Sequence, residues 1–173
     1  MKNLKLAVVA LALVMGVSFT AQAQAPYKHS IGATVGSMNA FSWKTFCDNH
    51  FAIQIDAGSK FTMGAFRNSS NCVYTAEANA NFMYQGHMSK KLYGFIGGGP
   101  SLGYCWNQSW EGWHYRHDIG KFGVNAIFGL ELKISAPVTF QWDFRPGYGM
   151  LFNENWTSHY FDWGLNFGVR YTF

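Results

Sequence analysis

The sequence has little charge for its length. Asp, Glu, Lys and Arg make up 13% of its 173 residues, whereas soluble domains average about 25%. After the first 25 residues, no apolar run approaches the roughly 20 residues that a membrane-spanning helix needs. No basic cluster exists beyond Lys90 and Lys91. These absences argue against an ordinary soluble surface, against a helical membrane protein after the N-terminal segment, and against nucleic-acid binding.

Aromatic residues and glycines are abundant instead. Phe, Trp and Tyr make up 18% of the chain, which also contains 19 glycines. Many aromatics with few charges indicate a large apolar surface that needs a non-aqueous environment. Hydrocarbon cannot satisfy free backbone N–H and C=O groups, so a chain without a helical span can cross a membrane only as a closed β-barrel.

The first 23 residues have the three parts of a secretory signal peptide. Lys2 and Lys5 are followed by an apolar run over residues 6–17 and by the small-x-small cleavage site at residues 21–23. We expect cleavage after Ala23, or as late as residue 25, and a single barrel domain over residues 24–173. Cleavage removes two of the 13 Lys and Arg, so 11 remain against 9 Asp and Glu.

The C-terminus alternates between apolar residues and small or polar ones from Phe161 to Phe173. Side chains of a strand point to alternate faces, so this run predicts a strand with one apolar face. The eight strands that we expect span residues 30–38, 51–57, 61–67, 74–84, 92–105, 122–133, 138–145 and 161–173. Bacterial single-chain barrels have an even number of strands. The sequence therefore predicts an all-β, antiparallel, eight-stranded up-and-down transmembrane β-barrel.

The connections are expected to alternate in length. Tight turns are predicted at residues 58–60, 86–90 and 135–137, longer loops at 37–50, 107–118 and 153–159, and a short exception at 68–71. Short turns on the periplasmic side and longer loops outside are the usual asymmetry, so both termini are expected to be periplasmic. The glycine-rich run 92–105 does not show which of its sides faces inward.

The polar face of these strands carries mostly Gly, Asn, Thr and Ser. On a soluble barrel of the lipocalin type the polar face meets water and would carry many Lys and Glu. Inside an eight-stranded barrel, small residues fit a space that side chains just fill. The pattern therefore favours aromatic residues toward lipid and small or charged residues toward the barrel axis.

At this point the chain resembles the small eight-stranded outer-membrane proteins of the OmpA and OmpX type. The resemblance depends on the leader, on the alternating strands, and on an ending with alternating Leu165, Phe167, Val169, Tyr171 and Phe173. This ending is similar to the signal read by the outer-membrane barrel assembly machinery. The resemblance implies an outer-membrane location, contact with membrane lipid including lipopolysaccharide, and the assembly machinery as a partner during insertion. We expect a monomer.

The charged residues of the polar face would form an ion-pair network inside the barrel. An unpaired charge in a low-dielectric interior is very costly, so these groups must be paired. The predicted network consists of Glu77, Glu131, Lys133, Asp143, Arg145, Asp162 and Arg170. Such a network would fill the interior. A narrow channel for small or apolar molecules is the alternative.

The predicted outer loop at 107–118 holds aromatic and ligand-type residues. Trp110, Trp113, His114 and His117 are candidates for binding outside the cell, because aromatic side chains bury much area at low entropy cost. Two histidines alone are a weak metal signal, since metal sites need three or four ligands in a defined geometry. We expect no metal and no cofactor.

A lipid A-modifying enzyme is a further alternative. A deacylase needs a Ser–His–acid set, and the candidates near the outer end are Ser158, His159, Ser109 and Glu111. Ser158 and His159 are adjacent, so they would point apart on a strand, and His87 with Ser89 lies in a predicted periplasmic turn. We therefore expect a structural or surface-binding protein and no enzyme.

The three cysteines allow one disulfide and one free thiol. Cys72 and Cys105 lie at the upper ends of two strands joined by the turn at 86–90, which would place them nearly opposite each other. Cys47 with Cys72 is the rival pairing.

Overall fold

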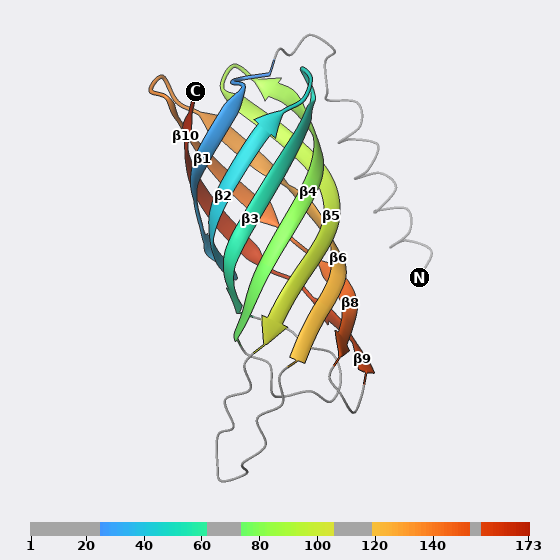
Figure 1. Cartoon of the computed structure of the whole chain (residues 1–173). Helices are drawn as coiled ribbons and strands as arrows, with labels where there is room; N and C mark the ends of the chain where they lie inside the picture. Colours follow the sequence, from blue (N-terminus) through green and yellow to red (C-terminus); the bar gives the residue numbers. More distant parts are fainter. Residues whose placement is uncertain (1–24, 62–73, 106–118, 153–156) are drawn as a thin grey trace, which may run out of the picture.

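The computed structural model describes residues 25–61, 74–105, 119–152 and 157–173, and these residues form a closed barrel of antiparallel strands (Figure 1). Every pairing between neighbouring strands of the ring is antiparallel. The strand segments are β1 (His29–Gly36), β2 (Met38–Phe46), β3 (Phe51–Phe61), β4 (Tyr74–Ser89), β5 (Leu92–Cys105), β6 (Ile119–Lys133), β7 (Val138–Phe144), β8 (Gly147–Phe152), β9 (Thr157–Asp162) and β10 (Leu165–Thr172).

Two of the barrel strands are interrupted without any change of register. β6 pairs with both β7 and β8, and the Ala126 N–H donates to the Pro146 carbonyl at 2.9 Å between them. Pro146 has no N–H of its own, which ends the regular ladder for one residue. Likewise Arg145 and Gly164 exchange two backbone hydrogen bonds, of 2.8 and 3.1 Å, between the β8–β9 and β7–β10 pairings.

The barrel therefore has eight strands, because β7 with β8 and β9 with β10 each form one. The ring closes where β10 pairs with β1 and where β5 pairs with β6. The predicted fold class, an all-antiparallel, up-and-down, eight-stranded barrel, is confirmed.

The structure corrects the predicted N-terminal third. The expected loop at 37–50 is mostly β2, and the expected turn at 58–60 lies inside β3. Phe61, where a third strand was expected to begin, is the last residue of β3, and residues 62–67 lie outside the described residues. The strand β2 was missed because Met38 and Phe46 face inward at its two ends, opposite to the apolar-outward pattern of the other strands.

A tight turn at Ser37 joins β1, which ends at Gly36, to β2, which begins at Met38. Gly36 has φ +136°, and a Cβ there would lie 2.4 Å from the Leu165 carbonyl oxygen. Both facts favour glycine, because an L side chain rarely adopts this backbone conformation.

We expect Gly36→Ala to lower the free energy of unfolding by about 1–3 kcal/mol, the cost of one strained backbone position. The measurement is a urea titration of the protein folded into lipid vesicles, followed by tryptophan fluorescence. Ser135→Ala, in another turn with an exposed residue, is the control and should change little. An unchanged midpoint for Gly36→Ala would contradict the strained turn.

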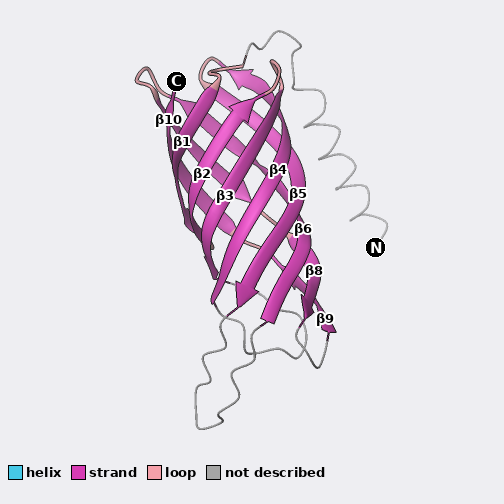
Figure 2. Ribbon diagram, viewed as in Figure 1, coloured by secondary structure: helices cyan, strands magenta, loops and turns pink. Residues whose placement is uncertain are grey.

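One end of the barrel carries the start of β1, the end of β10 and the turns between β2 and β3, β4 and β5, and β6 and β7 (Figure 2). We call this the terminal end. Strands β3, β5 and β8 finish at the opposite end. Among the described residues there is no helix long and apolar enough to span a membrane.

The two faces of the sheet differ sharply in chemistry. Large apolar side chains point outward, including Phe41, Phe82, Leu102, Trp142 and Leu165, which are 47–63% exposed. Polar and charged side chains are buried on the inner face. In the glycine-rich strand β5, Phe95, Ser101 and Cys105 face inward while Ile96, Leu102 and Tyr104 face outward.

Candidate functional site: the barrel interior

Among the described residues, the interior holds equal numbers of positive and negative side chains. Five cations and five carboxylates are buried there: Lys44, Lys60, Lys121, Arg145 and Arg170, with Asp56, Glu77, Glu131, Asp143 and Asp162. Because burial of an unpaired charge is costly, such an interior is stable only if each charge has a partner. The contacts divide these residues into three clusters along the barrel.

The cluster farthest from the terminal end consists of two lysines and two carboxylates. Lys60 on β3 lies 3.2 Å from Glu77 on β4 and 2.9 Å from Asp162 on β9. Lys121 on β6 contacts the same two carboxylates, at 2.6 Å and 2.8 Å. Each lysine thus bridges both acids, and the four strands are joined across the barrel by charge.

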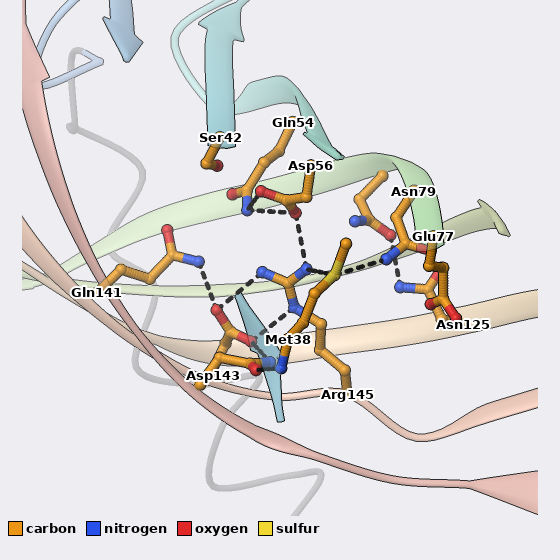
Figure 3. A network of polar contacts seen from close by, with 12 residues as sticks. Met38, Ser42, Gln54, Asp56, Glu77, Asn79, Asn125, Gln141, Asp143 and Arg145 are labelled. Carbon is orange, nitrogen blue, oxygen red and sulfur yellow. Dashed lines mark hydrogen bonds and ion pairs between the residues drawn. The ribbon is translucent and has the colours of Figure 1, made fainter. Parts of the chain in front are cut away.

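The central cluster is built around Arg145, which follows β7 and lies at the interruption beside Pro146 (Figure 3). Its Nε donates to Asp143 Oδ1 at 2.6 Å and its Nη2 to Asp143 Oδ2 at 3.1 Å. Its Nη1 donates to Asp56 Oδ2 at 2.7 Å. One guanidinium therefore binds two carboxylates from opposite parts of the sheet, using the fork of donors that lysine lacks. Arg170, 4.0 Å from Asp56, supplies the second positive charge.

Amides complete the coordination of these two carboxylates (Figure 3). Gln54 Nε2 donates to both Asp56 oxygens, at 3.1 and 2.9 Å. Gln141 Nε2 donates to Asp143 at 2.8 Å, and Asn166 Nδ2 donates to it at 2.9 Å. Asp143 thus accepts four hydrogen bonds from three side chains, so the central cluster is held in one arrangement.

The third cluster lies nearest the terminal end. Lys44 Nζ lies 2.6 Å from Glu131 Oε2 and also donates to Gln85. The same ammonium lies 5.8, 5.2 and 5.4 Å from the ring centroids of Tyr27, Phe46 and Phe95. Fully buried Lys44 is therefore surrounded by an anion, an amide and three aromatic rings, which are the partners that a buried ammonium needs.

Apolar side chains close the interior beyond the charged clusters. Near the terminal end, Phe46, Ala52, Met83, Phe95 and Ile127 pack together, and Ala25 and Tyr27 cover them from the segment before β1. Toward the other end, Cys105, Ile119, Leu151 and Tyr160 form a second buried cluster. Burial, with the nearby Glu131 carboxylate adding to it, raises the pKa of the Tyr27 hydroxyl, so Tyr27 is neutral at physiological pH. The described interior is thus filled by side chains along its length.

The structure brings together six of the seven residues predicted for the interior network. Glu77, Glu131, Asp143, Arg145 and Asp162 form the ion pairs given above. Arg170 donates to Gln141 and, at 2.7 Å, to Ser42, and it lies 4.0 Å from Asp56. Lys133 differs, because it is at the end of β6 and donates to the backbone carbonyl of Pro26. It forms no ion pair with a described carboxylate.

Four interior charges were absent from the predicted network. Lys44 and Lys60 were missed because they stood in a predicted loop and a predicted turn. Asp56 was placed on the inner face of its strand, but no partner was assigned to it. Lys121 lies two residues before Gly123, on the same inward face of β6. It would have been found if the predicted strand had begun one inward-facing position earlier.

The other candidate residues are placed only in part. Trp110, Trp113, His114, His117, Ser109 and Glu111 lie outside the described residues. Ser158 is half-buried, whereas His159 is exposed and stacks on outward-facing Tyr148 at a centroid distance of 5.9 Å. Ser158 and His159 therefore point to opposite faces. In the described part of the chain, no group of three or more His, Cys, Asp or Glu is arranged to hold a metal ion.

The cysteines are divided between a disulfide and a thiol. Cys105 is disulfide-bonded, and Cys47 is free and exposed in the turn between β2 and β3. A free Cys47 contradicts the rival pairing of Cys47 with Cys72. Cys72 lies outside the described residues, so its pairing with Cys105 stays a prediction.

The proposed assembly residues lie along the outer face of β10. Leu165, Val169, Tyr171 and Phe173 are 40–62% exposed, and Phe167 packs between Phe140 and Trp142 at centroid distances of 5.9 and 5.3 Å. All five thus belong to the apolar outer face of the barrel.

Known proteins resemble this chain in fold and not in sequence. No protein-family model matches it, and no curated protein matches its sequence. The N-terminal β-barrel domain of Pseudomonas aeruginosa OprF superposes on it with a TM-score of 0.63 and 13% identity, over 88% of this chain and 100% of that chain. Neisserial surface protein A superposes with a TM-score of 0.57 and 14% identity, over 84% of this chain and 93% of that chain. The chain therefore shares the closed eight-stranded antiparallel fold of these small outer-membrane β-barrel proteins.

Proposed function

We propose that the protein is an integral outer-membrane β-barrel with a structural or surface-binding role. One observation carries the proposal: large apolar side chains cover the outer face, while ten charged side chains are buried inside. A soluble barrel would reverse this arrangement, since its outer face must meet water. In this function the filled barrel is a scaffold in the bilayer, and the end at which β3, β5 and β8 finish faces the outside of the cell. Because of this location, we also propose lipopolysaccharide and the barrel assembly machinery as partners.

The need for detergent tests this proposal. We expect the mature chain to be recovered from the outer-membrane fraction and to stay monomeric and folded only in detergent or lipid. Folding is measured by its heat-dependent migration in dodecyl sulfate gels and monomer size by ultracentrifugation. A mature chain that is monomeric and folded in plain buffer would contradict the membrane assignment.

A packed interior also predicts the conductance of the protein. We infer that the three ion clusters and the two apolar clusters block a continuous water-filled path, so a planar bilayer containing the protein should show no stable current steps. Conversion of Lys44 and Glu131 to alanine would remove an ion pair in which both side chains are fully buried. This double variant is compared with the unmodified protein to detect conductance through an opened interior. Stable steps from the unmodified protein would favour the narrow channel instead.

A further inference from the structure

Among the described residues, charge outside the interior is concentrated at the terminal end. The five cations and five carboxylates inside cancel, which leaves Lys28, Lys90, Lys91 and Lys133 as the other described cationic side chains. Asp48 is the described acidic side chain at that end. The terminal end is therefore positive overall.

Three of these lysines are close together on two adjoining turns. Lys90 and Lys91 form the turn between β4 and β5, and Lys133 ends β6 before the turn to β7 (Figure 1). The Lys133 N–H donates to the Lys91 carbonyl at 2.8 Å, and Lys91 Nζ donates to Ser135 Oγ at 2.9 Å. We call these three lysines and Ser135 the lysine cluster.

No described carboxylate neutralises the lysine cluster. The sequence of these two turns contains no Asp or Glu from Met88 to Tyr93 or from Lys133 to Val138, and none of the described ion pairs includes its lysines. Lys90, Lys91 and Ser135 are exposed. Two ammonium groups and a hydroxyl are thus available to one anion.

Next to the lysine cluster, apolar side chains follow β5 and β6 along the outer face of the barrel. Leu92 pairs with Leu132, and farther along Ile96 pairs with Phe128. Ile96, Phe128 and Leu130 are 36–52% exposed on the outer face. The surface therefore presents cations at the strand ends and a column of apolar side chains beside them.

We propose that Lys90, Lys91 and Ser135 bind the phosphate of an anionic glycerophospholipid, whose acyl chains lie along Leu92, Leu132 and Ile96. Lysines near a bilayer surface attract anionic headgroups. A cell-wall polymer would use the cations but not the apolar column, so the combination favours a lipid. The inference rests on the proposed membrane location. The lipid that it assigns to this site belongs to the membrane leaflet in which the terminal end of the barrel lies.

Titration of the folded mature protein with lipid in non-ionic detergent, followed by native mass spectrometry, tests the site. The probes are phosphatidylglycerol and phosphatidylcholine with identical acyl chains, and soluble glycerol phosphate. We expect tighter binding of phosphatidylglycerol than of either other probe. The double variant K90Q/K91Q should weaken phosphatidylglycerol binding by about thirtyfold, the effect of two lysines near a membrane surface, and leave phosphatidylcholine binding unchanged.

K28Q is the matched control. Lys28 is also exposed at the terminal end, but it shares its surroundings with Asp48, so its loss should change phosphatidylglycerol binding less than twofold. Equal binding of the two lipids, unchanged binding by K90Q/K91Q, or stronger binding of glycerol phosphate than of lipid would overturn the site. The site would also be overturned if the protein showed no lipid preference but sedimented with purified peptidoglycan in a way that depends on these two lysines.

The result is separable from the membrane assignment. Heat-dependent gel migration shows whether the barrel has formed in detergent before any lipid is added. A folded barrel without the lipid preference refutes the site alone, whereas a chain that is folded and monomeric in plain buffer refutes the membrane location itself.

Discussion

Replacement of Arg145 with methionine is expected to lower the free energy of unfolding by about 3–5 kcal/mol, the usual loss when one partner of a buried ion pair is removed. Asp56 and Asp143 would keep their charges in the interior without the guanidinium that now contacts both, at 2.7 Å and 2.6 Å. The measurement is urea unfolding of the protein in lipid vesicles, followed by tryptophan fluorescence.

A double variant separates charge from packing in this cluster. In R145M/D143N one positive and one negative side chain are neutralised together, and Asp56 keeps Arg170 at 4.0 Å, so most of the loss should be recovered, because neutral replacement of a buried ion pair is often tolerated. If the double variant is as unstable as R145M, the lost volume of the arginine is responsible, and the electrostatic account of the central cluster is wrong.

Phe82→Arg is expected to cost about 2–4 kcal/mol in a bilayer, the range for arginine on the lipid face near the membrane midplane. Phe82 lies near the middle of β4 and is 63% exposed on the outer face. The midpoint of urea unfolding in vesicles measures the effect.

Met88→Arg is the depth-matched control on the same strand. Met88 lies near the terminal end of β4 and is 45% exposed, and arginine near the interface costs about 0–1 kcal/mol. Equal effects at the two positions, or improved solubility of Phe82→Arg in plain buffer, would show that the outer face does not lie in lipid.

The sequence alone was sufficient for the fold class because alternation survives in most strands. Residues 122–133 and 161–173 place every second side chain on one face without exception. A strand period of two is a local property, so it can be found without knowledge of the partner strands. The same pattern placed Glu77, Glu131, Asp143 and Arg170 inside the barrel.

The local pattern failed where interior packing overrides it. Met38 and Phe46 face inward because each fills a place among interior side chains, and Met38 Sδ accepts from Asn79 Nδ2 at 3.2 Å. Gly58 faces the backbone of β2, where a Cβ would lie 2.1 Å from the Asn39 carbonyl oxygen, so a strand residue was taken for part of a turn. Both errors concern contacts with another strand, which the local sequence does not reveal.

The sequence by itself determined the barrel class, its aromatic outer face and most of the side chains that line its interior, because these follow from residue type and a period of two. Only the tertiary structure decided which charges meet. Asp56 and Arg145 are 89 positions apart in the chain, and Lys44 and Glu131 are 87 positions apart. Their pairing depends on the register and closure of the whole sheet, because a one-residue slip of any strand would turn its charges from the interior toward the lipid.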